Sequence, residues 1–214
     1  MLSEATVDHL LNGGVVAYPT STLPGLACLP TASALDALYE LKGRTADKPV
    51  SLGVLSLDQA SKLVHVPQIV VELEMAFTRG GITFVLDAVE SLDDRLGGHR
   101  VAVRCMAHPT ARAIVERVGP ITATSANEAG IRPESSAQEA GRVLGLPHHA
   151  ILNGTCPGGL GSTFVGVTLT ETGPEVTVMR EGVVPANDVM KWWTNRTSSI
   201  GETPGMSLDE HSRP

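Results

Sequence analysis

The chain has 214 residues, enough to bury one sizeable core, and its 16 Lys and Arg against 23 Asp and Glu give a formal net charge of −7. Because a protein whose whole surface attracts nucleic acid needs a broad basic face, this composition excludes that class, and any bound phosphate must be held locally. The three cysteines do not form a disulfide framework or a CxxC zinc pair, and we find neither a signal-peptide pattern nor an apolar run of membrane-spanning length, so we expect a cytoplasmic protein with no membrane contact.

Apolar residues at helical and strand spacing alternate through the first 125 residues. The spacing predicts helices over about 3–12, 32–42, 57–64, 67–78 and 108–118, and strands over about 15–18, 50–55, 82–86, 100–104 and 120–124. Strands interleaved with helices are typical of a mixed α/β fold. Two of these strands run into polar loops, and α/β proteins place their ligands beyond such strand ends.

The rest of the chain continues the pattern and then loses it. It contains a predicted helix over 136–144, a strand over 149–153, a glycine-rich connection over 154–161, a hairpin formed by 163–170 and 175–180, and a final helix over 185–193. From Asn195 onward the chain is rich in Ser, Thr, Gly and Pro and has no apolar periodicity. We therefore expect one domain over residues 1–194 and a flexible C-terminal tail over 195–214.

A short basic cluster follows the helix predicted at 32–42. Lys42, Arg44 and Lys48 lie close together in an otherwise acidic chain. A guanidinium binds phosphate oxygens bidentately and an ammonium supplies a mobile point charge, so the cluster suits a triphosphate. The alternative for Lys42 is simple capping, because the helix dipole favours a lysine in the last turn.

Three later features lie at predicted strand ends. They are the polar loop over 122–127, Ser162 after the glycine-rich segment, and Arg180 at the end of the last strand. Hydroxyl and amide groups in such places can hold ribose, phosphate or a polar substrate. The alternatives are ordinary turn and cap residues, a flexible connector and an exposed salt bridge.

Several common catalytic motifs are absent from the sequence. The glycine-rich segment has neither the Lys-Ser/Thr ending of a Walker A loop nor GxGxxG spacing, and the seven histidines show no metal-ligand spacing. No Ser-His-Asp set or GxSxG elbow can be assembled. We therefore expect no resident metal and no catalytic nucleophile.

Six short motifs together resemble one known family. They are Tyr18-Pro19-Thr20-Ser21-Thr22-Leu23-Pro24-Gly25-Leu26, Lys42-Gly43-Arg44 with Lys48-Pro49, Val101-Ala102-Val103-Arg104, Thr124-Ser125-Ala126-Asn127, Ser162-Thr163-Phe164-Val165 and Arg180-Glu181-Gly182. In order and spacing they resemble the YrdC-domain family, the threonylcarbamoyl-AMP synthases, over about residues 3–185. The resemblance implies a YrdC-like α/β fold, a twisted mixed sheet with flanking helices around a cationic cavity.

The resemblance also implies an activity and a set of site residues. The activity is a nucleotidyl transfer in which L-threonine, bicarbonate and ATP give threonylcarbamoyl-AMP and pyrophosphate for N6-threonylcarbamoyladenosine in tRNA, with Mg²⁺ on the phosphates and tRNA or tRNA-modifying proteins as candidate partners. Positioning and electrostatic stabilisation, with no catalytic side chain, are enough for this chemistry. The implied ATP contacts are Lys42, Arg44, Lys48, Asn127 and Arg180, and the implied threonine contacts are Thr22, Arg104, Ser125 and Ser162.

The chain departs from the family pattern mainly on the amino-acid side. Ser21 stands where the family has an acid, Pro24 where it has a tyrosine, and Gly53 where it has a histidine; Arg79-Gly80-Gly81 replaces Pro-Gly-Pro and Gly166 replaces an Asp. These differences favour one alternative to the synthase, a divergent nucleotide- or RNA-binding protein without turnover. Two further alternatives stay open: a paralogue that uses another carbamoylated amine, and a component of a larger tRNA-modifying assembly.

Overall fold

The computed structural model describes residues 2–201, with backbone only for 199–201, as a mixed α/β fold. Its elements, in chain order, are α1 (Glu4–Leu11), β1 (Val16–Tyr18), β2 (Gly25–Ala27), α2 (Ala32–Lys42), β3 (Ser51–Val54), α3 (Leu57–Ala60), α4 (Gln68–Ala76), β4 (Ile82–Asp87), the 3₁₀ helix η1 (Asp94–Leu96), β5 (Arg100–Cys105), α5 (Pro109–Val118), β6 (Ile121–Ser125), α6 (Ala137–Val143), the 3₁₀ helix η2 (His148–Ala150), β7 (Thr163–Thr170), β8 (Gly173–Arg180) and α7 (Ala186–Gly201).

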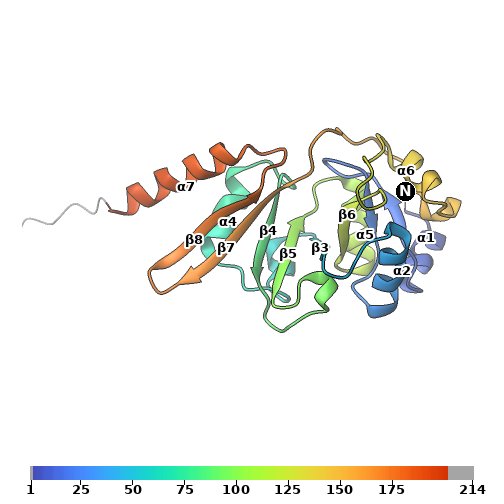
Figure 1. The fold of residues 1–214 in the computed structure, drawn as a ribbon, viewed down its shortest axis with the longest axis horizontal. Coiled ribbons are helices and arrows are strands. Elements are labelled where there is room, and N and C mark those ends of the chain that lie inside the picture. The colour runs from blue at the N-terminus through green and yellow to red at the C-terminus, as the bar shows by residue number, and fades with distance from the viewer. Residues whose placement is uncertain (1, 202–214) are drawn as a thin grey trace, which may run out of the picture.

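The strands form one eight-stranded sheet in the order β1-β2-β6-β3-β5-β4-β7-β8. The pairs β3–β5 and β4–β7 are parallel and the other neighbouring pairs are antiparallel. The β7–β8 hairpin and α7 extend from one end of the molecule, and α1, α2 and α6 gather at the other (Figure 1). The predicted fold class, a twisted mixed sheet with flanking helices, is confirmed.

Apolar side chains fill both faces of the sheet. One cluster joins the strands to α2 and α4, and the other joins them to α1 and α5. Strand β1 shows why all of its residues are buried: Ala17 belongs to the first cluster, whereas Val16 and Tyr18 belong to the second. Successive side chains of a strand point to opposite faces, so a strand covered on both faces has a continuous apolar run, even at the edge of the sheet where β1 lies.

The end of α2 sets the direction of the basic turn. Gly43 has a φ of 54°, in the left-handed region that glycine adopts without a Cβ penalty. The amide of Gly43 donates to the carbonyl of Glu40 at 3.1 Å, and the amide of Arg44 donates to that of Tyr39 at 3.0 Å. These bonds satisfy carbonyls that the last helical turn leaves free, and they turn the chain back toward the sheet.

Four sequence expectations about individual elements differ from the structure. The strand predicted at 149–153 is wrong, because η2 occupies its start and Ile151 forms only an isolated bridge with Ala17. The helix predicted at 57–64 ends at Ala60, and the short strand β2 was not predicted. Finally, α7 continues to Gly201, so residues 195–201 of the predicted tail are helical, and residues 202–214 lie outside the described residues.

Within residues 2–201 we find no helix whose length and apolar character would let it cross a membrane.

Candidate active site

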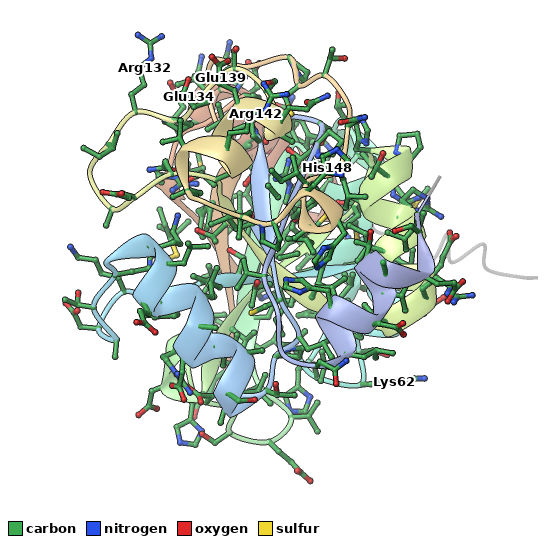
Figure 2. All side chains as sticks on the ribbon, turned by 90° about the vertical axis from the view of Figure 1, so that its right-hand side faces the viewer. Lys62, Arg132, Glu134, Glu139, Arg142 and His148 are labelled. Atoms are coloured by element: carbon green, nitrogen blue, oxygen red, sulfur yellow. The ribbon has the colours of Figure 1, made fainter. Side chains whose placement is uncertain are left out.

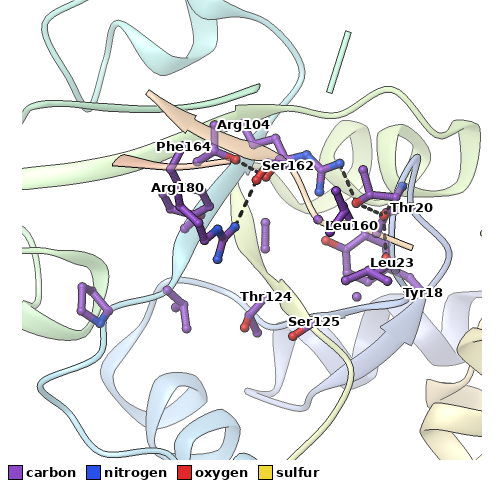
Figure 3. A pocket seen from close by; sticks show the side chains of 18 of the residues that line it. Tyr18, Thr20, Leu23, Arg104, Thr124, Ser125, Leu160, Ser162, Phe164 and Arg180 are labelled. Carbon is purple, nitrogen blue, oxygen red and sulfur yellow. Dashed lines mark hydrogen bonds between the residues drawn. The ribbon is translucent and has the colours of Figure 1, made fainter. Parts of the chain in front are cut away.

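A cavity of about 360 Å³ lies where the ends of several strands meet the basic turn after α2. Its wall includes residues from β1 and the loop after it, from β3, β5 and β6, and from the start of β7 and the end of β8. Six of the nine predicted site residues line it: Thr22, Arg44, Arg104, Ser125, Ser162 and Arg180. Figure 3 labels the last four of these. The structure thus brings together side chains that are far apart in the sequence, and it confirms a cationic cavity.

Arg104 is the most buried cation of the cavity wall, with 9% of its surface exposed. Its Nε donates to the carbonyl of Gly80 at 2.9 Å, and its Nη2 donates to the hydroxyls of Thr22 at 3.0 Å and Ser21 at 3.2 Å. These partners are neutral, and within the described part of the chain Arg104 forms no ion pair with a carboxylate. Burial lowers the pKa of the guanidinium. Such a group favours an anionic ligand that supplies the missing charge.

The loop between β1 and β2 is held by its own threonines. The Thr20 hydroxyl donates to the carbonyl of Leu23 at 2.6 Å and accepts from the amide of Thr22 at 3.0 Å. The carbonyl of Thr22 in turn accepts from the amide of Gly158 at 2.9 Å, which ties the glycine-rich segment to this wall. The loop therefore presents the Thr22 hydroxyl in a fixed position beside Arg104.

Ser162 lies at the entry to β7 and is 5% exposed. Its hydroxyl is 2.7 Å from that of Thr83, on the adjacent strand β4. The next hydroxyl, Thr163 Oγ1, accepts from the amides of Gly182 and Val184 at 2.9 and 3.1 Å. These bonds fix the start of β7 against the segment that follows β8.

Arg180, at the end of β8, faces Phe164 across the hairpin. Its guanidinium carbon lies 4.1 Å above the centre of the Phe164 ring, and its Nη2 donates to the carbonyl of Ser162 at 3.1 Å. Stacking on an aromatic face holds a guanidinium and leaves its edge free for an anion. Burial lowers the pKa of this group as well.

Of the two cations in the turn after α2, Arg44 lines the cavity and Lys48 does not. Half-buried Arg44 donates from Nε to the carbonyl of Lys48 at 2.6 Å and from Nη2 to that of Pro49 at 3.0 Å. Lys48 is exposed and is absent from the cavity wall, so the structure does not place it with the other predicted ATP contacts.

Lys42 and Asn127 also lie outside the cavity wall, and each is engaged elsewhere. Lys42 is 1% exposed, and its Nζ donates to the carbonyls of Ser125 at 2.5 Å and Asn127 at 2.6 Å. Burial, assisted by the charge of Arg44, lowers the pKa of Lys42 to about 8. The side-chain Nδ2 of Asn127 donates to the backbone carbonyls of Glu128 and Ile131, both at 2.7 Å. In this structure Lys42 therefore holds the polar loop after β6 through hydrogen bonds to its backbone. Neither of the two roles considered for Lys42 from the sequence, helix capping and phosphate binding, includes this contact.

Several residues of the wall were missed by sequence reasoning. Tyr18, Thr20, Thr83 and Phe164 line the cavity but were not among the predicted site residues. Three of them lie within the motifs of the resemblance, which do not show which of their members face a ligand, and Thr83 lies within a plain strand pattern. The two threonines could have been found only by knowing that their hydroxyls meet those of Thr22 and Ser162.

Three of the departures from the family pattern can be described from their local contacts. A Cβ at Gly53 would collide with the terminal methyl group of Met106, so the methionine occupies the space that a larger residue would need. Ser21 replaces an acid with a neutral hydroxyl that Arg104 uses as an acceptor. Pro24 is buried, and its carbonyl accepts from the amide of Ala126 at 2.8 Å, so it joins the loop after β1 to the loop after β6.

The cavity of this α/β sheet gathers Arg44, Arg104 and Arg180, none of which forms an ion pair with a carboxylate of residues 2–201, an arrangement suited to anionic ligands. The model of the Sua5/YciO/YrdC family, described as "Telomere recombination", matches residues 8–182. The chain belongs to this family.

Curated relatives and a solved structure agree with that membership. The chain is 34% identical over 142 residues, 64% of this chain and 75% of the relative, to a threonylcarbamoyl-AMP synthase of Marinobacter nauticus. It is 36% identical over 155 residues, 70% of this chain and 81% of the relative, to the protein of the same name from Halorhodospira halophila. The structure of P. abyssi Sua5 complexed with L-threonine aligns with a TM-score of 0.73 at 30% identity over 86% of this chain; the chain spans 55% of that protein's length.

Proposed function

We propose that this chain is a threonylcarbamoyl-AMP synthase, a nucleotidyltransferase that converts L-threonine, bicarbonate and ATP into threonylcarbamoyl-AMP and pyrophosphate. The observation that carries the proposal is the buried guanidinium of Arg104, which has no carboxylate partner among residues 2–201 and shares one cavity with Arg44 and Arg180. The names of the relatives and the threonine complex of P. abyssi Sua5 support the same activity.

On the amino-acid side, Arg104 binds the carboxylate and the nearby hydroxyls bind the remaining polar groups of threonine. A guanidinium already fixed by three hydrogen bonds loses little freedom when it binds a carboxylate. Thr22 lies directly beside it, while Ser125 and Ser162 line the same cavity. These residues account for a small, zwitterionic substrate with a hydroxyl.

On the nucleotide side, Arg44 and Arg180 bind the phosphates. Both line the cavity, and the stacking of Arg180 on Phe164 directs its polar edge away from the ring. Lys42 acts indirectly by holding the loop of Ser125 and Asn127, and its buried positive charge adds to the potential that attracts a polyanion. Lys48, exposed at the turn, contributes only long-range attraction.

The chemistry needs no covalent intermediate on the protein. The threonine amine and bicarbonate form a carbamate and water, a carbamate oxygen attacks the α-phosphorus, and pyrophosphate leaves. The cavity brings amine, carbamate and phosphate together, and its cations stabilise the charge that develops on the phosphate oxygens.

Magnesium enters this proposal with its nucleotide. In the described part of the chain no group of three or more His, Cys, Asp or Glu side chains could hold a metal ion, and Glu181 is the single carboxylate of the cavity wall. These residues do not form a dedicated metal cage, and a Mg²⁺ bound mainly by phosphates and water fits them better. As a source of a tRNA precursor, the protein would act in the cytoplasm, with tRNA or tRNA-modifying proteins downstream.

The rival function, RNA binding without turnover, receives little support from the surface. Arg132 and Arg142 project from the end of the molecule near α6, but Glu134 and Glu139 lie among them (Figure 2). Interspersed charges of both signs do not make the broad basic face that phosphate-backbone binding needs.

The decisive experiment measures pyrophosphate release from purified protein with MgATP and bicarbonate, offering each amino acid in turn, and identifies the adenylate by mass. We expect release with threonine and the mass of threonylcarbamoyl-AMP. Pyrophosphate release with a different amino acid would identify that amino acid as the substrate in place of threonine. Salt-sensitive RNA binding without pyrophosphate release would favour the rival function.

A further inference from the structure

Tyr18 is a buried tyrosine that lines the cavity and was not among the predicted site residues. It ends β1, pairs with Gly25 of β2, and is 1% exposed. A Cβ at Gly25 would lie 2.9 Å from both Cε1 and Cζ of the Tyr18 ring, so the glycine provides the flat surface on which the ring rests. Figure 3 shows Tyr18 near Thr20 and Leu23.

Among residues 2–201 the Tyr18 hydroxyl has no hydrogen-bond partner, and its oxygen is not one of the side-chain atoms sealed from water, so it opens to the cavity. The chain has only one other tyrosine, Tyr39, whose hydroxyl lies 2.9 Å from the carbonyls of both Lys48 and Arg95. A hydroxyl at the wall of a cavity is hydrogen-bonded to water when the cavity is empty, and a ligand that displaces this water must offer an acceptor in its place. A phenol that faces the cavity and has no protein partner can therefore donate to a bound ligand.

The neighbourhood of Tyr18 selects an anion as that ligand. Burial raises the pKa of Tyr18 to about 12 and the nearby charge of Arg104 lowers it, so the hydroxyl remains protonated at neutral pH and can donate. Arg104 uses Nε and Nη2 for its protein contacts, while Nη1 has no partner among residues 2–201. Two donors that face one cavity without an acceptor between them suit an oxyanion.

We propose that the Tyr18 hydroxyl donates a hydrogen bond to the carboxylate-type anion bound at Arg104, and so acts as a substrate-binding residue of the amino-acid side. The inference rests on the proposed function. The carboxylate of threonine is the expected anion, and bicarbonate, which has the same oxygen geometry, is the other source.

The test uses Tyr18→Phe, which removes one oxygen and leaves the ring on Gly25. Threonine and bicarbonate are titrated separately into wild-type protein and the variant by calorimetry. In parallel, the protein is labelled with ¹³C at tyrosine Cζ, where two signals are expected and Tyr39→Phe assigns them. A neutral donor to a charged acceptor predicts a loss of threonine affinity of about tenfold or more in Tyr18→Phe. The Tyr18 signal should shift on threonine addition while the Tyr39 signal stays in place.

The outcomes separate this inference from the function on which it rests. Equal threonine affinity in wild type and variant, with an unmoved Tyr18 signal and normal pyrophosphate release, would overturn the Tyr18 assignment and leave the synthase intact. A shift with bicarbonate alone would support the hydrogen bond and assign it to bicarbonate. Absence of threonine binding and of pyrophosphate release in the wild type would end both proposals. Tyr39→Phe is also the control for hydroxyl removal, since threonine affinity should not change there.

Discussion

At the scale of single residues, Arg104 gives the clearest prediction, because its role depends on the shape of its head group as well as on its charge. Arg104→Lys keeps a cation but cannot contact Gly80, Thr22 and a carboxylate at once. We expect the KM for threonine to rise on the order of 10- to 100-fold, with a much smaller change in the KM for ATP. Steady-state pyrophosphate release measures both constants.

The matched control for Arg104→Lys lies on the same strand. Arg100 begins β5 and forms a partly exposed ion pair with Asp87 at 2.8 Å, away from the cavity wall. Arg100→Lys should leave both KM values within about twofold, because exposed ion pairs contribute little. An equal rise in the threonine KM in both variants would assign the effect to the strand rather than to the site.

A second prediction concerns Lys42 and tests whether this residue holds the polar loop after β6 even when no ATP is bound. Lys42→Met has a similar volume but leaves the carbonyls of Ser125 and Asn127 without their donor. Without any nucleotide, amide hydrogen exchange over residues 126–129 should accelerate about tenfold or more. Arg44→Met, whose lost bonds lie within its own turn, should leave that exchange unchanged. If Lys42→Met exchanges at the wild-type rate, the loop is held by other contacts.

At the scale of elements, the N-terminus of α5 should respond to acid. His108 Nδ1 accepts from the amide of Thr110 at 3.2 Å, which requires an unprotonated nitrogen, and burial lowers the pKa of His108. As the pH falls below the unfolded value of about 6.5, the unfolded chain takes up the proton first, so this contribution to stability is present at higher pH and is lost on acidification.

His108→Asn tests this directly, because asparagine is a good N-cap that does not titrate. Between pH 7.5 and 5, the free energy of unfolding of the wild type should fall by about 1 kcal/mol relative to the variant. Urea denaturation at both pH values measures the difference. If the free energy of unfolding changed equally with pH in the wild type and in His108→Asn, His108 would not act as a titrating N-cap.

At the scale of the whole molecule, α7 lies outside the segment matched by the family model, and none of its residues lines the cavity. Its Trp192 packs edge-on against Phe77, and Arg196 pairs with Glu72 at 2.9 Å. Trp192→Ala should therefore lower the free energy of unfolding by about 2 kcal/mol without changing either substrate KM. The more exposed Met190→Ala should cost about 0.5 kcal/mol or less. A changed threonine KM in Trp192→Ala would show that α7 is coupled to the site.

Sequence patterns predicted the elements with long, clear periodicity and the residues with distinctive chemistry. The helix at 32–42 and the cations Arg44 and Arg180 were found because apolar spacing and charge are visible locally, whereas Arg104 was found through the resemblance of its motif. The strand β2 is too short for a pattern. The burial of Lys42 and the place of Tyr18 depend on tertiary packing, which no local window contains.

The contact between Gly53 and Met106 couples two positions that lie on adjacent parallel segments of the sheet. A side chain at position 53 needs the space that the terminal methyl group of Met106 occupies, so Met106 must either change its conformation or be replaced by a shorter residue. Gly53→His alone would overpack the interior, whereas the double exchange with Met106→Ala would restore the fit. Substitutions at these two positions are therefore expected to be coupled, and a variant of one should be designed together with the other.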